Sequence, residues 1–252
     1  MRPPPDPRKL LEALPQAIRL LETVPSPSPW REVVVVPFAA SVRKPLEPGS
    51  ILGAARSSQP MRRSGAWAGH PFFPWLDLGP RPDAGTQGVR WQFTGSRGYD
   101  GIFTIGYDGS FLQRELVREL SHPAPASGPG VGLFTTLDTI AGALLFARNL
   151  ASHFPDYGRA WVVLRMGMVE RAKLLLDFEE GHAPPAQRSS SAGVRQSIVG
   201  VGGNFKPTLT NLELSQFCGQ LGAELASAFE WTWEPSSASA EIAARLAAAV
   251  ED

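Results

Sequence analysis

Residues 88–116 read GVRWQFTGSRGYDGIFTIGYDGSFLQREL, a pattern typical of consecutive antiparallel strands. Apolar and polar residues alternate before and after the glycine-rich run 95–101, and the Val, Ile, Phe and Trp side chains suit a pleated, half-buried surface. Asp108-Gly109 favours a type I′ turn, which joins two antiparallel strands. Residues 111–120 also have charge spacing that fits a helix. We favour a strand for their first half, because the hairpin needs a partner.

A helix follows this meander after a loop at residues 121–132. Thr135 or Thr136 can cap its beginning, and Pro155 ends it. One broad apolar stripe at helical spacing is expected to face the sheet. Residues 160–166 then form a strand that is apolar enough to be covered on both faces, and residues 172–178 are its predicted hairpin partner.

The whole chain is therefore predicted to be an α+β protein. Its sheet is mixed but mainly antiparallel, with helices packed mostly on one face. We expect a Pro-rich tail and helix at 1–30, a single domain at 31–234 and a C-terminal helix at 235–252. Residues 211–230 form a second amphipathic helix within the domain, whereas 44–88 show no periodicity. The predicted strands are 32–37, 89–94, 101–107, 110–116, 160–166 and 172–178.

Composition limits the classes of function that are open. The chain has 252 residues, of which 43% are hydrophobic, and its 24 basic and 24 acidic residues cancel. A zero net charge argues against an electrostatic footprint for nucleic acid or anionic membrane. The single cysteine, Cys218, cannot form an intrachain disulfide and is expected to be a buried thiol. We see neither a signal peptide nor a membrane span, so we expect a cytoplasmic protein.

Catalytic motifs are weak. Asp177 and Glu179 place two carboxylates on one face of a strand end, with His182 nearby, and such a pair could hold a divalent cation. A polar turn is the favoured interpretation, because no second acidic cluster accompanies them. The run 200–204 (GVGGN) could cradle a phosphate but matches no nucleotide-binding fingerprint, so we interpret it as a plain turn. We predict no cofactor and no metal.

The best candidate for a binding surface is the irregular segment before the meander. Basic residues there precede an aromatic cluster, and arginine and tryptophan dominate interface hot spots. The same combination can stack bases and hold phosphates. The alternative is that these rings cap the core. The candidate binding residues are Arg62, Arg63, Trp67, Phe72 and Trp75.

Three runs carry a resemblance to a known family: RGYDG (97–101), GYDGSFLQRE (106–115) and AWVVLRMGM (160–168). Residues 88–178 resemble the region that follows the DNA-binding (AlbA-type, Schlafen-like) domain of some bacterial proteins. Residues 1–87 show no match to that domain itself. The resemblance implies an accessory or sensor domain, and it transfers no functional residue.

The leading functional hypothesis is a non-enzymatic binding or interaction module, with a regulatory or sensor role in a bacterial protein system. Its expected partner is another protein or a second copy of the chain, and nucleic acid is the less favoured alternative. The rival hypothesis is a metal-dependent hydrolase or nuclease that uses Asp177 and Glu179.

Overall fold

Strand β1 (Trp30–Pro37) lies in the middle of the sheet, and its sequence explains why. Four consecutive valines, Val33 to Val36, are buried on both faces of the strand. A strand with two buried faces needs a neighbour on each edge to satisfy its backbone. β1 pairs antiparallel with β5 (Phe111–Leu116) on one side and with β7 (Ala160–Gly167) on the other.

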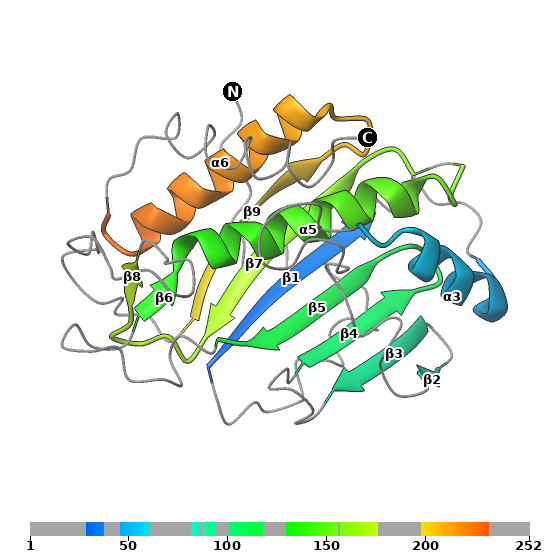
Figure 1. The fold of residues 1–252 in the computed structure, drawn as a ribbon, viewed down its shortest axis with the longest axis horizontal. Coiled ribbons are helices and arrows are strands. Elements are labelled where there is room, and N and C mark those ends of the chain that lie inside the picture. The colour runs from blue at the N-terminus through cyan, green and yellow to red at the C-terminus, as the bar shows by residue number, and fades with distance from the viewer. Residues whose placement is uncertain are drawn as a thin grey trace.

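The computed structural model describes residues 29–37, 46–60, 82–85, 88–93, 101–117, 130–155, 157–175 and 198–231. In this part of the chain seven strands form one sheet, in the order β2-β3-β4-β5-β1-β7-β9, and each neighbouring pair is antiparallel (Figure 1). The remaining members are β2 (Asp83–Ala84), β3 (Gly88–Phe93), β4 (Gly101–Gly106) and β9 (Ile198–Phe205).

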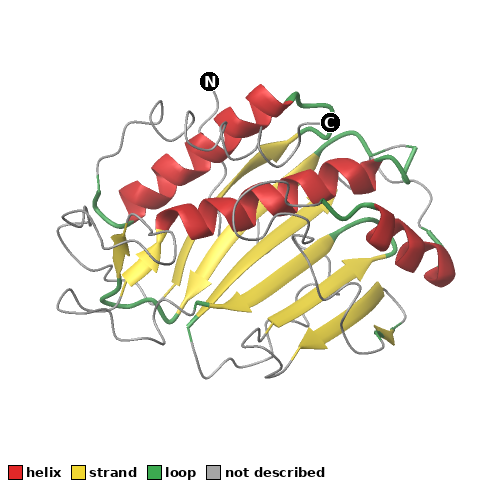
Figure 2. Ribbon diagram, viewed as in Figure 1, coloured by secondary structure: helices red, strands yellow, loops and turns green. Residues whose placement is uncertain are grey.

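Three helices lie in front of this sheet in the view of Figures 1 and 2. They are α3 (Pro48–Ser57), α5 (Leu133–Ala151) and α6 (Asn211–Ala228). α5 contacts β1, α6 contacts β9 and α3 contacts β3. α5 connects β5 to β7, which run parallel to each other with β1 between them. The α+β class and the mainly antiparallel sheet predicted from the sequence are confirmed.

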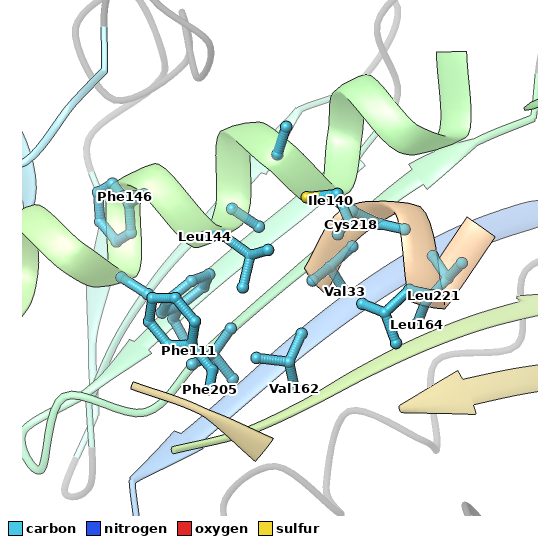
Figure 3. Packing of buried hydrophobic residues seen from close by; sticks show 14 of the residues in the cluster. Val33, Phe111, Ile140, Leu144, Phe146, Val162, Leu164, Phe205, Cys218 and Leu221 are labelled. Atoms are coloured by element: carbon cyan, nitrogen blue, oxygen red, sulfur yellow. The ribbon is translucent and has the colours of Figure 1, made fainter. Parts of the chain in front are cut away.

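The core lies between the helices and the sheet. Phe103, Phe111 and Phe146 pack edge to face or stacked, with ring centroids 5.0–5.9 Å apart, and join strands β4 and β5 to α5. Ile140 of α5 and Cys218 of α6 belong to the same buried cluster (Figure 3). The apolar stripe predicted for α5 is buried, because it faces this cluster. The other face of the sheet is also buried in its centre: Val34, Leu112 and Val163 are at most 1% exposed.

The β4–β5 hairpin forms where the sequence predicts it, but its turn is not type I′. That type needs a positive φ at two central residues, and only Gly109 has one here, at 81°. Gly109 N–H donates to Gly106 O at 3.0 Å, and Gly106 N–H donates to Ser110 O at 2.7 Å. The loop is therefore a three-residue turn with glycine in the left-handed position. Asp108 stabilises it by accepting from the Ser110 N–H and hydroxyl.

Two predictions for the segments after α5 are wrong: the pairing of the strand at 172–178 and the turn at 200–204. Residues 173–175 form β8 (Lys173–Leu175), which pairs in parallel with β6 (Gly130–Gly132) in a separate small sheet and not with β7. On the side away from β1, the partner of β7 is β9, along its full length of eight residues. The run 200–204, interpreted as a turn, lies inside β9. Glycines weaken the strand signal there, and pairing with β7 overrides it.

Helix beginnings also differ from the sequence prediction. α5 begins at Leu133, with Gly132 as the N-cap, so neither Thr135 nor Thr136 caps it; the Thr136 hydroxyl instead donates to Gly132 O at 2.6 Å. α3 lies in the segment where no periodicity is visible. It begins with Pro48, whose fixed φ and missing N–H suit the first helical turn. Of the tail and helix predicted at 1–30, residues 1–28 lie outside the described residues, and so does the C-terminal helix predicted at 235–252.

Candidate functional site

The most concentrated group of charges lies on the face of the sheet away from α5. Glu32 of β1 stands directly opposite Arg114 of β5 and directly opposite Arg165 of β7. Arg114 donates from Nε to Glu32 Oε2 at 2.7 Å, and its Nη2 lies 2.6 Å from the same oxygen. Arg165 donates from Nε to Glu32 Oε1 at 2.7 Å and forms a second contact through Nη2. One carboxylate thus bridges three adjacent strands.

Trp30 covers this group. Its ring centroid lies 4.6 Å from the guanidinium carbon of Arg114 and 5.7 Å from that of Arg165, both within the range of a cation–π contact. The indole lies across Gly167, its partner in the β1–β7 register, and a Cβ at that position would overlap the ring. Glycine is therefore required at 167 by the close approach of Trp30.

This group can hold strands in register, but it is not placed to perform catalysis. Glu32 is fully buried, and Arg114 and Arg165 are 8% and 7% exposed. A carboxylate held by four N–H groups of two guanidiniums is an acceptor only, and it has no free lone pair aimed at solvent. Buried charges cost desolvation free energy that their attraction offsets only with good geometry. We therefore interpret Glu32, Arg114 and Arg165 as a group that fixes the register of strands β5, β1 and β7, and we call it the register lock.

A second ionic network lies on the helix side of the same strands. Arg31 donates from Nε to Glu115 Oε1 at 2.8 Å and from Nη1 to the Thr136 hydroxyl at 3.0 Å. Thr139 also donates to Glu115 Oε1 at 3.0 Å. This network ties β1 and β5 to the first two turns of α5. Alternate residues of β1 thus fix the strand to its neighbours on one face and to the helix on the other.

The two edges of the seven-stranded sheet differ in length and in charge. β2 has two residues, Asp83 and Ala84, and both are exposed. β9 has eight residues, IVGVGGNF, with no charged side chain and no proline. Its one side pairs with β7, and among the described strands none pairs with its other side. Natural sheets guard their edges with short strands, charges, proline or bulges, and β9 has none of these.

The turn between β7 and β8 is strained. Met168 and Arg171 have φ values of 58° and 65°, in the left-handed region that side chains with a Cβ disfavour. Met168 is 49% exposed, and Arg171 is exposed as well. Val169 between them is buried, and its carbonyl accepts from Ala172 N–H at 2.9 Å. The two residues with positive φ flank a buried side chain, so we interpret the strained backbone of this turn as a consequence of packing Val169 into the core.

Two ionisable groups of the described core, Cys218 and Tyr157, are held in their neutral forms by burial. Burial raises the pKa of the Cys218 thiol, so the thiolate is disfavoured. Burial and the nearby Asp108 carboxylate raise the pKa of Tyr157. His153, just after α5, contacts the Ser57 hydroxyl at 3.0 Å and links the end of α3 to the end of α5. Cys218 is the buried thiol that the sequence predicts.

The candidate residues from the sequence lie outside the described part of the chain. This holds for Asp177, Glu179 and His182, and equally for Arg62, Arg63, Trp67, Phe72 and Trp75. Within the described ranges, no group of three or more His, Cys, Asp or Glu side chains could hold a metal ion. The metal-site and aromatic-segment hypotheses thus remain predictions from the sequence.

Sequence reasoning missed both the register lock and the long edge strand. Arg165 within the apolar run AWVVLRM is the signal for the first, because a charge in a buried strand needs a partner. For the second, Val199 and Val201 alternate with Gly200 and Gly202, which is a strand period of two. Glycine is depleted in strands and favours turns, so the sequence alone predicts a turn at this position.

The comparisons add no relative. No family model, no curated protein and no solved structure matches this chain. Among the described helices, none is both long and apolar enough to cross a lipid bilayer.

Proposed function

We propose that this chain is a non-enzymatic interaction module that binds an extended protein segment along β9. The supporting observation is the eight-residue edge without charge, proline or a described neighbour on its outer side. Alternate residues of an edge strand point their N–H and C=O groups outward, and an added strand satisfies them. Backbone pairing of this kind supplies affinity without a deep pocket.

The opposite edge supports the proposal by contrast. β2 is too short to offer a ladder, and it carries the exposed carboxylate Asp83. Both features hinder edge-to-edge pairing. A short, charged edge and a long, uncharged edge in the same described sheet are consistent with a specific use of β9. The resemblance to an accessory region of bacterial DNA-binding proteins is in keeping with a regulatory or sensor role for such a module.

A peptide-display selection on dilute, immobilised protein tests the proposal. We expect the selected peptides to alternate apolar and polar residues, and to lose binding when Asn204, exposed on β9, is replaced in Asn204→Lys. The matched control is Ala84→Lys on β2, which places the same side chain on the other edge and should leave binding intact. Selection of no peptide, or equal binding by both variants, would overturn the proposal.

Calorimetric titration with Mg²⁺, Mn²⁺ and Zn²⁺ separates this proposal from the rival metal-dependent hydrolase. An interaction module should show no site-specific heat of binding. Saturable binding of a divalent cation that Asp177→Ala abolishes would favour the hydrolase instead.

A further inference from the structure

We infer that the strand that adds to β9 is β9 of a second copy of this chain, in antiparallel orientation, so that two seven-stranded sheets join into one. This inference rests on the proposed use of β9 as a binding edge and names the occupant.

Symmetry favours a second copy. An antiparallel pair of identical strands is related by a two-fold axis perpendicular to the sheet, which gives a closed, self-complementary interface. Each neighbouring pair in the described sheet is already antiparallel, so the joined edge continues the same ladder. The same axis places the helices of both copies on one side of the joined sheet. Residues facing the helices in one copy then pair with residues facing the helices in the other.

Charge favours a second copy over a foreign peptide. β9 contains no ionised side chain, so two identical strands do not repel each other when paired. A charged foreign segment would find no opposite charge on β9 to select it. The helix α6, which packs on β9, carries Glu213 and Glu224. The lack of charge is therefore a feature of strand β9 and not of α6.

The faces of β9 suit close approach. Toward the helices, Val199, Val201 and Phe205 are buried, so they are already part of the core. Toward the other face, Gly200 and Gly202 have no side chains to obstruct a neighbouring strand. Phe217 of α6 is half-buried over Gly203, where a Cβ would lie 2.9 Å from its ring.

Sedimentation velocity on the full chain measures the association. Between about 1 and about 100 µM, the range in which small interfaces dissociate, we expect a shift from 27.2 kDa toward twice that mass. Asn204→Lys should weaken the dimer by about tenfold or more, because a lysine on the edge blocks strand addition. Ala84→Lys should dimerise like the natural chain.

Hydrogen exchange locates the interface. Backbone amides of residues 198–205 should exchange more slowly at high protein concentration, and Asn204→Lys should shift that slowing to about tenfold higher concentration or beyond. A chain that stays monomeric at 100 µM overturns the second-copy inference, while peptides selected on β9 would still support the proposed function. A dimer whose exchange at 198–205 does not depend on concentration uses another surface, and this also overturns the inference.

Discussion

At the scale of single residues, Glu32 has the largest structural consequence. Its carboxylate accepts from side chains that lie 82 and 133 positions away in the sequence. It therefore fixes which strands flank β1 and in which register, because a slip of one residue would turn the carboxylate to the helix face. A buried charge that depends on distant partners makes the fold specific at the cost of desolvation.

Replacement of Glu32 tests this role. Glu32→Gln should lower the free energy of unfolding by about 3 kcal/mol or more, because two buried guanidiniums lose their carboxylate. The control is Glu115→Gln in the Arg31 pair. The Glu115 side chain is 20% exposed, so water can replace part of the lost interaction and the cost should be about 1 kcal/mol. Urea unfolding of both variants gives the comparison, and equal costs would contradict the register lock.

Gln113 is a second residue with a measurable prediction. It is 3% exposed, and among the described residues its Oε1 has no hydrogen-bond partner. A buried acceptor without a partner destabilises the folded state. Gln113→Met, which keeps the side chain's length, should leave stability unchanged or raise it by up to about 1 kcal/mol. Gln113→Ala should instead cost about 2 kcal/mol by leaving a cavity. A loss with Met as large as with Ala would show that the amide is needed.

At the scale of elements, the beginning of α6 combines two caps. The Thr210 hydroxyl accepts from Glu213 N–H at 3.3 Å, and the Glu213 carboxylate accepts from Thr210 N–H at 2.8 Å. Thr210→Ala should therefore lower the free energy of unfolding by about 1 kcal/mol. Ser152→Ala, at the exposed end of α5, is a control that should cost less.

The same cap predicts a pH dependence. Hydrogen bonds from the Thr210 backbone and then its side chain lower the pKa of Glu213. A lowered carboxyl pKa contributes stability that is fully present above the ordinary glutamate value of about 4.3 and is lost as the pH falls through the lowered value. The difference in stability between the natural chain and Glu213→Gln should thus shrink as urea unfolding is repeated toward acid pH. A difference that grows toward acid pH would contradict this sign.

In the strained β7–β8 turn, substitution should raise the stability of the protein and not lower it. Glycine adopts the left-handed region without the steric cost that Met168 and Arg171 bear. Met168→Gly and Arg171→Gly should each stabilise the protein by about 0.5 kcal/mol after the added entropy of the unfolded chain is subtracted. Met168→Ala keeps the Cβ and should give no gain. Thermal unfolding measures all three, and destabilisation by both glycines would show that these side chains make contacts that matter.

At the scale of the whole molecule, self-association along β9 links stability to concentration. A dimer that dissociates on unfolding has a Tm that rises with protein concentration by mass action. We expect this rise for the natural chain and for Ala84→Lys, and a smaller rise over the same concentrations for Asn204→Lys, because its dimer is weaker. Scans across a hundredfold range of concentration would reveal it, and identical behaviour of the three proteins would argue against a dimer through β9.

Local sequence patterns determined several features of this protein by themselves. The β4–β5 hairpin, the buried valine strand β1 and the helices α5 and α6 follow from alternation, Asp-Gly and periods of 3.6 residues. Each of these signals depends only on residues that lie a few positions apart in the sequence. Most of the candidate binding and metal residues, by contrast, came from segments outside the described part of the structure.

Only the tertiary structure decided how the strands are arranged. β8 was expected beside β7, and the glycine-containing β9 takes that place instead. The Glu32 bridge and the place of β9 at the edge of the described sheet both depend on which distant strands become neighbours. Arg165 and the Val-Gly alternation at 199–202 indicate a buried charge and a strand, but not their partners. Strand order is set by burial of shared faces and by pairing of backbone groups far apart in sequence, and a local pattern contains neither.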